Sequence, residues 1–356
     1  MSTRKILITG NEAIAEGAIQ AGCRFYAGYP ITPQNELIAY MATHMPQAGG
    51  VFIQSESELA AINMVFGASA AGARAMTSSS SPGISLKQEG ISYIAGAELP
   101  AVIVNIMRGG PGLGNIAPAQ SDYFQATRGG GHGDYRTIVF SPAYVQEAYD
   151  LMQRAFDLAD IYRMPVIILS DGMLGQMMEP ISVVRRPSTV DEDMRKTKKW
   201  ALTGCVGRNP NIIKSFYLRE GDLEKFNIIL QNKYKLIQKK EQLFEASFIN
   251  DAKIILVAYG TMARIAKSAA QKLQEMGKKV GLIRPITLWP FPVDVIQRLA
   301  GRSKNAQFLV IEMSYGQMLE DVRLAVNGKL PVEFLGRSGG GMPSEEEIIS
   351  KVRRLL

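Results

Sequence analysis

Short apolar runs alternate with longer helical runs from residue 5 to about residue 170, and this alternation restricts the possible folds more than any other feature. The predicted strands are residues 5–9, 25–28, 51–54, 73–77, 101–107, 137–140 and 165–170. Helical patterns fill residues 11–21, 34–44, 57–71, 83–95 and 143–161. Uniformly apolar strands separated by helices are typical of parallel sheets covered on both faces. The pattern therefore predicts an α/β fold with a doubly wound parallel sheet.

The alternation stops near residue 178 and resumes near residue 253. Between these points lie three prolines, dense charge and an amphipathic stretch at 223–244 that predicts one surface helix. The second alternating region is long enough for a compact domain of its own. We therefore expect three parts, at residues 1–180, 181–250 and 251–356.

Composition argues against a membrane protein. Hydrophobic residues make up 46% of the chain and charged residues 21%, but the apolar runs are far shorter than the roughly 20 residues that span a bilayer. The first residues predict a strand and a turn, and they lack the apolar core of a secretory signal. We expect a cytoplasmic protein that does not contact a membrane.

Cysteine and histidine are too scarce for a metal centre built by this chain alone. The two cysteines, Cys23 and Cys205, cannot supply the four thiolates that an iron–sulfur cluster takes. The two histidines, His44 and His132, have no carboxylates at a spacing that would complete a site. We predict no metal ligands in this chain, and any redox centre must belong to another one.

The net charge of +7 raises the question of nucleic-acid binding. The basic clusters at 195–199 and 239–240 lie among acidic residues, and no series of aromatic residues accompanies them. We therefore expect no nucleic acid as a partner. A solvated connector, or a docking surface for an acidic partner, explains the clusters better.

Two polar loops follow neighbouring predicted strands. One is Tyr29-Pro30-Ile31-Thr32-Pro33, and the other is the run from Gln54 to Glu58. Open α/β sheets bind their ligands where strands end and helices begin. Both loops can face one cavity, so we expect them to form half of a cofactor site.

Two further segments belong with these loops. A serine-rich turn at 77–83 has Ser81 as the predicted helix N-cap and Pro82 as the first helical residue, although its hydroxyls and helix amides also suit an anion. The segment from 108 to 136 holds eight glycines and predicts a long site loop. By contrast, Ser170-Asp171-Gly172 predicts a plain strand-to-helix turn.

Glu58 is the strongest candidate for chemistry. A carboxylate at the start of a helix is partly explained by the helix dipole, but Glu56 would already serve that purpose. A second carboxylate beside small residues suggests a group that hydrogen-bonds a ligand from a desolvated position. Gly67, inside the same helix, indicates either close packing or ordinary helix-on-sheet contact.

These motifs together carry a resemblance to a known family. The loop at 29–33, the run at 54–58, the serine-rich turn at 77–83, Arg108-Gly109-Gly110-Pro111 and the segment 284–292 resemble the α subunit of the thiamine diphosphate dependent 2-oxoacid:ferredoxin oxidoreductases. The likeness covers nearly the whole chain. Within the family, the segments 108–114 and 129–136 most resemble the enzymes of branched-chain 2-oxoacids. The resemblance implies that 1–180 is a pyrimidine-binding domain and 251–356 a transketolase C-terminal-like domain, joined by a connector at 181–250.

The resemblance also implies roles for individual residues. Glu58 stands nine residues before Gly67, the family's separation, and would hydrogen-bond N1′ of the aminopyrimidine as the activating acid–base group. Thr32 and Arg108 would contact the carboxylate of the 2-oxoacid, a task that suits the planar arginine fork. The other residues expected in the cofactor site are Tyr29, Pro30, Ile31, Ser79 and Ser80.

The implied reaction is the oxidative decarboxylation of 2-oxoisovalerate to an acyl-CoA. Thiamine diphosphate would be shared with a β subunit that carries the pyrophosphate and Mg²⁺ site. A γ subunit, a ferredoxin-like δ subunit with [4Fe–4S] clusters, external ferredoxin and coenzyme A complete the implied set. Alternatives are a pyruvate enzyme, a 2-oxoglutarate enzyme with Arg128 or Arg136 on the second carboxylate, or a non-catalytic regulatory or binding subunit.

Overall fold

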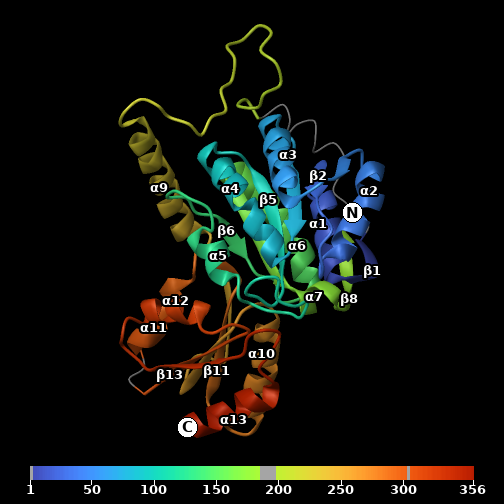
Figure 1. Ribbon diagram of the computed structural model, residues 1–356. Helices are drawn as coiled ribbons and strands as arrows, with labels where there is room; N and C mark the ends of the chain where they lie inside the picture. Colours follow the sequence, from blue (N-terminus) through green and yellow to red (C-terminus); the bar gives the residue numbers. More distant parts are fainter. Residues whose placement is uncertain (1–2, 185–197, 303–304) are drawn as a thin grey trace.

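The computed structural model describes residues 3–184, 198–302 and 305–356 (Figure 1). Its larger sheet has seven strands in the order β12-β6-β7-β5-β4-β2-β3. All neighbours in this sheet pair in parallel except β12 with β6. The strands are β2 (Phe25–Gly28), β3 (Val51–Gln54), β4 (Ala75–Ser79), β5 (Ala101–Met107), β6 (Ile138–Phe140), β7 (Pro165–Asp171) and β12 (Thr287–Trp289). The predicted α/β class with a parallel sheet is confirmed.

Helices cover both faces of this sheet (Figure 1). One set contains α1 (Gly10–Gln20), α2 (Asn35–Gln47), α6 (Val145–Tyr162) and α7 (Gly172–Gln176), and the other contains α3 (Glu58–Ala70) and α4 (Ser81–Gly96). The chain leaves β2 in one direction and β4, its neighbour, in the other. The carboxyl ends of these two strands therefore flank the point where the winding reverses, which is where such sheets bind ligands. Among the described helices, none is long and apolar enough to cross a membrane.

The first predicted strand is not part of the large sheet. β1 (Thr3–Thr9) pairs antiparallel with β8 (Met178–Val184) in a separate two-stranded sheet over α1 and α6. Its inner residue Ile8 joins a small apolar cluster, whereas Leu7 is 65% exposed. The sequence pattern gives no strand at 178–184 because Pro180 interrupts the run. A proline has no N–H group to donate, so it is tolerated in an edge strand at a position where the backbone nitrogen faces no neighbouring strand.

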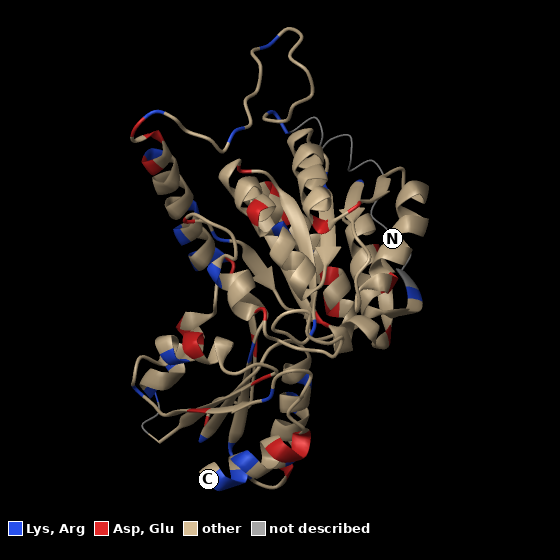
Figure 2. Ribbon diagram, in the orientation of Figure 1, with Lys and Arg blue, Asp and Glu red and all other residues tan. Residues whose placement is uncertain are grey.

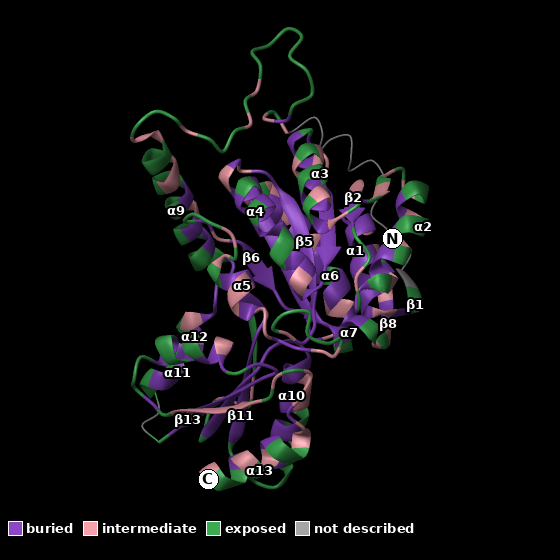
Figure 3. Cartoon of the chain, in the orientation of Figure 1, coloured by how far each residue is buried: buried purple, intermediate pink, exposed green. Residues whose placement is uncertain are grey.

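The connector contains an exposed arm and one long helix. Residues 198–221 form no regular element and extend away from the sheets to α9 (Asp222–Lys240), within the region where a surface helix was expected (Figures 1 and 3). This helix begins with acidic residues and ends with Lys239 and Lys240, which matches the helix dipole (Figure 2). Residues 195–197 of the predicted basic cluster lie outside the described residues.

A second sheet lies in the C-terminal part, with the order β14-β13-β10-β11-β9. Only β9 runs antiparallel to its neighbour. The strands are β9 (Phe244–Ser247), β10 (Ile254–Val257), β11 (Val280–Pro285), β13 (Gln307–Glu312) and β14 (Val332–Gly336). The helices are α10 (Gly260–Glu275), α11 (Val293–Arg302), α12 (Gln317–Val326) and α13 (Glu345–Leu355). The predicted second α/β region is thus present.

The two sheets are joined by a shared strand and by buried polar contacts. β12 comes from the C-terminal part but extends the first sheet beside β6. Gln120 bonds both the Tyr259 carbonyl and the Met313 amide at 2.9 Å. Arg284 bonds both carboxylate oxygens of Glu147 at 2.8 Å. One apolar cluster runs through both parts. The division of the chain into parts at residues 180 and 250 therefore stays a prediction.

Candidate active site

The loops after β2 and β3 lie together at the carboxyl edge of the large sheet. Gly28 and Gln54, the last residues of the two strands, are paired, and the Ser55 hydroxyl donates to the Gly28 carbonyl at 3.1 Å. The first loop is open to solvent: Tyr29, Pro30 and Thr32 are exposed and Ile31 is half-buried. The expectation that the loops face the same region agrees with this arrangement.

Glu58 is the first residue of α3 and is 6% exposed. Ser57 caps the helix by accepting a bond from the Ala60 amide at 3.1 Å. The cap is therefore satisfied without a carboxylate. Within the described ranges, no hydrogen bond or ion pair reaches the Glu58 side chain. A buried carboxylate with no donor from its own chain is free to bind a ligand.

The start of α4 lies against the Glu58 carboxylate. A Cβ placed on Gly83 would overlap the Ser79 Oγ and would lie 2.5 Å from Glu58 Oε1. The Ser79 and Ser80 hydroxyls are buried and have no hydrogen-bond partner. The helix begins at Ser81, so its N-cap is Ser80 and Pro82 is its second residue, and both expectations were wrong by one residue. The Ser81 amide, which has no partner within the helix, donates to Asn105 Oδ1 at 3.1 Å. Unpaired hydroxyls, a carboxylate and a glycine that leaves space fit a polar heterocycle such as an aminopyrimidine.

Arg108 is brought against Thr32 by the loop that follows β5. Its Nη1 donates to the Thr32 carbonyl at 2.9 Å and its Nη2 to the Leu113 carbonyl at 3.3 Å. The Arg108 Nε is buried and unpaired. Its backbone amide donates to the Ser81 Oγ at 3.0 Å. The guanidinium is thus fixed by two hydrogen bonds and still has N–H groups without a partner, as recognition of a carboxylate requires.

Asp122 supports this arrangement from the glycine-rich segment. Its Oδ2 accepts from the Ser81 hydroxyl at 2.6 Å and from Asn105 Nδ2 at 2.9 Å, and burial raises the pKa of this carboxyl above its usual value. The segment is not wholly irregular, because it contains the short helix α5 (Tyr123–Arg128). A cleft of about 690 Å³ opens beside it, between Ser81, the loop 109–112 and Tyr315 of the C-terminal part.

Two residues of this region were missed in the sequence. Lys87 of α4 is fully buried, and its Nζ donates to Thr77 Oγ1 at 3.0 Å and to the Glu58 carbonyl at 3.4 Å. Burial lowers the pKa of Lys87 to about 7, and the charge of Glu58 opposes this. Gly83 was seen only as a helix start. One feature of the sequence could have indicated Lys87: it stands four residues after Gly83 and three residues before Gly90, so all three lie on the same face of the helix.

Comparisons with known proteins agree with this geometry. Residues 16–218 match the family model of the pyruvate flavodoxin/ferredoxin oxidoreductase thiamine diphosphate-binding region. Residues 252–348 match core domain II of pyruvate:ferredoxin oxidoreductase. The chain belongs to the 2-oxoacid:ferredoxin oxidoreductase family. It is a subunit of an oxidoreductase, as the resemblance implied.

Relatives of this oxidoreductase subunit match over most of its length. The ketoisovalerate oxidoreductase subunit VorB of Methanothermobacter thermautotrophicus is 49% identical, over 98% of this chain and 97% of that protein. The 2-oxoglutarate synthase subunit KorA of Archaeoglobus fulgidus is 43% identical, over 89% of this chain and 90% of that protein. A solved 2-oxoglutarate:ferredoxin oxidoreductase from Magnetococcus marinus, with 2-oxoglutarate, coenzyme A and succinyl-CoA bound, superposes with a TM-score of 0.86 at 28% identity. The match covers 98% of the subunit and 65% of that solved chain.

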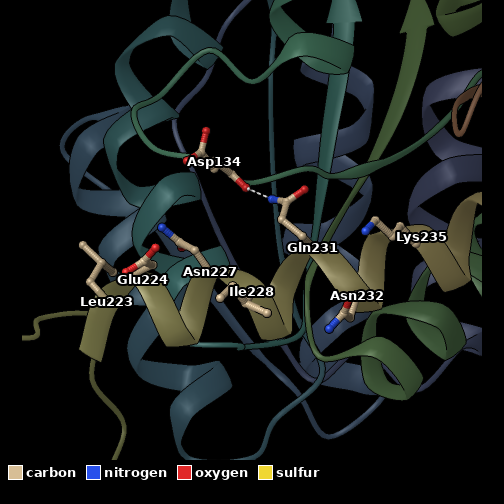
Figure 4. Close-up of a pocket in the computed structure, with 8 residues that line it drawn as sticks. All are labelled: Asp134, Leu223, Glu224, Asn227, Ile228, Gln231, Asn232 and Lys235. Carbon is tan, nitrogen blue, oxygen red and sulfur yellow. Dashed lines mark hydrogen bonds between the residues drawn. The ribbon is translucent and has the colours of Figure 1, made fainter. Parts of the chain in front are cut away.

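Other features of the subunit lie away from this site. A hollow of about 510 Å³ runs along α9, where Gln231 Nε2 donates to the Asp134 carbonyl at 2.8 Å (Figure 4). It contains none of the predicted site residues. Among the described residues, nothing lies within 4 Å of a Cβ added to Gly67, so Gly67 is not packed closely against any of them. In the described part of the chain, no three His, Cys, Asp or Glu side chains are grouped to hold a metal ion.

Proposed function

We propose that this chain supplies the pyrimidine half of a thiamine diphosphate site in a complex that oxidatively decarboxylates 2-oxoisovalerate to an acyl-CoA and passes the electrons to ferredoxin. Glu58, Ser79, Ser80 and the loop containing Tyr29, Pro30 and Ile31 hold the cofactor. Thr32 and Arg108 bind the carboxylate of the substrate.

The observation that carries the proposal is the Glu58 carboxylate. It is buried at the carboxyl edge of the sheet, where its Oε1 and the unpaired Ser79 hydroxyl both lie beside Gly83, and no described residue donates a hydrogen bond to it. A buried polar group normally has a hydrogen-bond partner. A bound aminopyrimidine whose ring nitrogen carries a proton would supply the donor that this carboxylate lacks.

Glu58 has a defined chemical task in this arrangement. Thiamine diphosphate, when bound, supplies the nucleophilic carbon and the electron sink that decarboxylation needs. Glu58 holds or releases the proton at the pyrimidine nitrogen, while its position at the first turn of α3 fixes the carboxylate. Arg108 orients the substrate through its carboxylate, since two backbone carbonyls keep the guanidinium in one direction. Holding the substrate in one orientation lowers the activation free energy, because less translational and rotational entropy is lost on reaching the transition state.

The choice of a branched-chain monocarboxylate rests on the relatives and on two arginines. VorB relatives are 49% and 50% identical to this chain, and the KorA relative of Archaeoglobus fulgidus is 43% identical. Arg128 is paired with Asp321 at 2.8 Å, and Arg136 donates to the Thr127 carbonyl at 3.2 Å. Both line a different hollow, beside Trp289. These partners and this separate hollow favour the monocarboxylate over 2-oxoglutarate.

The family consists of multi-subunit enzymes, and the missing functions are assigned to partners. We place the pyrophosphate and Mg²⁺ site on a β subunit, and the [4Fe–4S] clusters on a ferredoxin-like δ subunit, with a γ subunit completing the complex. Cys23 is buried and Cys205 is exposed, and two cysteines are too few for a cluster in this chain. Coenzyme A takes the acyl group.

The test uses the complex reconstituted from this chain and its partner subunits. Reduction of ferredoxin is followed with 2-oxoisovalerate, 2-oxoglutarate and pyruvate, each with and without coenzyme A. We expect the highest kcat/KM for 2-oxoisovalerate and a strict requirement for coenzyme A. A preference for 2-oxoglutarate or pyruvate would reject the substrate assignment and leave the role of Glu58 standing.

A pair of glutamine variants tests the cofactor role. Glu58→Gln should lower kcat by about 10²–10⁴-fold, the usual contribution of a positioned acid–base group. Glu56→Gln is the matched control, because Glu56 is exposed and lies two residues earlier. It should retain the activity of the unaltered chain. Equal activity of both variants would point to the non-catalytic alternative.

A further inference from the structure

The contact between α3 and α4 is made close by two glycines of α4. A Cβ on Gly83 would lie 2.5 Å from Glu58 Oε1, and a Cβ on Gly90 would lie 2.6 Å from the Ile62 side chain. Residues seven apart lie on the same face of a helix. This face of α4 is therefore pressed against the start of α3, with no space for larger side chains at those two positions.

Lys87 lies on the same face, between the two glycines. It is fully buried, and its Nζ donates to Thr77 Oγ1 on β4 at 3.0 Å and to the Glu58 carbonyl at 3.4 Å. It forms no ion pair with a described residue. The two bonds connect α4, β4 and the first turn of α3.

Packing alone does not account for a lysine at this position. An unbranched apolar side chain such as methionine would fill the same space without removing an ammonium group from water. Among the described residues, Glu58 is the ionisable group whose charge acts on Lys87, and its neighbours on β4 are uncharged. The buried cation is thus directed at the residue that the proposed function makes central.

We infer that Lys87 is a positioning residue for Glu58, holding the first turn of α3 in place through its bonds to the Glu58 carbonyl and to Thr77 on β4. The inference rests on the proposed function, because it gives Lys87 a role only if Glu58 binds the cofactor. Lys87 does not touch the substrate in this arrangement.

The test compares Lys87→Met, Lys87→Gln and Glu58→Gln in the reconstituted complex. Lys87→Met removes both the charge and the hydrogen bonds, whereas Lys87→Gln removes the charge but keeps a hydrogen-bond donor on a slightly shorter side chain. Lys278→Met is the control, because Lys278 is exposed on the turn after α10. The measurements are the affinity for thiamine diphosphate by calorimetry, and kcat and KM for the 2-oxoacid.

We expect Lys87→Met to weaken thiamine diphosphate binding about tenfold, the effect of losing a charge-assisted hydrogen bond. The KM for the 2-oxoacid should stay unchanged. Lys87→Gln should bind the cofactor more tightly than Lys87→Met, because it keeps a hydrogen-bond donor. If Lys87→Met does not fold, the cofactor affinity and the substrate KM of Lys87→Gln carry the test.

Two results would overturn the inference. One is a cofactor affinity within twofold of that of the unaltered complex for both Lys87 variants. The other is a change in substrate KM with cofactor affinity unchanged. Loss of activity in Glu58→Gln alongside either result would reject only the role of Lys87. Full activity in Glu58→Gln would reject the proposed function itself.

Discussion

Replacing Gly83 by alanine should damage the active site while leaving the fold nearly intact. The new Cβ would lie 2.5 Å from Glu58 Oε1, whereas ordinary contacts are 3.4 Å or longer, and it would overlap the Ser79 Oγ. Both atoms are side-chain ends that can turn away. The carboxylate must therefore move by about 1 Å, a misplacement that costs on the order of 100-fold in rate. The stability change should stay within about 1.5 kcal/mol, because alanine also favours the helix.

The assay is 2-oxoacid-dependent reduction of ferredoxin by the reconstituted complex, together with urea denaturation of the full chain. Gly301→Ala is the matched control, because Gly301 lies in α11 and an added Cβ meets nothing within 4 Å. It should retain the full rate. A Gly83→Ala complex with an unchanged rate and unchanged cofactor affinity would refute the placement of Glu58 beside α4.

Three other predictions concern stability, each measured by urea denaturation of the full chain. Lys87 has a folded pKa lowered by burial to about 7, against 10.5 for the free side chain, so the unfolded chain binds more protons between these values and stability rises with pH. Lys87→Met removes this rise, which should amount to roughly 4 kcal/mol between pH 7 and 10; parallel profiles of the two chains would contradict it. Arg284→Met removes two bonds to the Glu147 carboxylate, which keeps the Ala143 amide as a donor, and one bond to Glu245, and it should cost about 3 kcal/mol; a loss below about 1 kcal/mol would show that water replaces the arginine. Asp171→Ala removes the cap of α7 and the bond from Thr261, so we expect a loss of about 2 kcal/mol, and an unchanged midpoint would speak against it.

Much of the fold could be predicted because buried parallel strands are uniformly apolar. β2, β3, β5 and β7 start where the pattern places them and end within one residue of it. The pairing of the strands could not be predicted in this way, since it joins residues far apart in the sequence. β1 has strand character, but only its partner β8 shows that it lies outside the large sheet. β12 has three residues and no pattern of its own.

In the candidate site too, local sequence patterns indicate some residues, whereas the contacts between distant segments cannot be predicted from them. Glu58 could be proposed from the sequence because a second carboxylate in one short run was not needed at the start of the helix, and the structure shows that Ser57 caps this helix. The surroundings of Arg108 depend on how the glycine-rich segment folds back to Leu113. Lys87 escaped notice because a lysine is usually a surface residue. Its burial results from the approach of two helices, which no local pattern records.

The shared edge of the large sheet limits how this polypeptide can be divided. β6 would be an outermost strand if β12 did not pair with it, and the Ser141 amide is also covered by the Ile286 carbonyl at 2.8 Å. An uncovered strand offers unpaired amides and carbonyls to other molecules and promotes aggregation. A gene split near codon 250 would therefore yield an N-terminal fragment in which β6 is an uncovered, aggregation-prone edge strand. The catalytic glutamate proposed for this fragment lies at the opposite edge of the sheet.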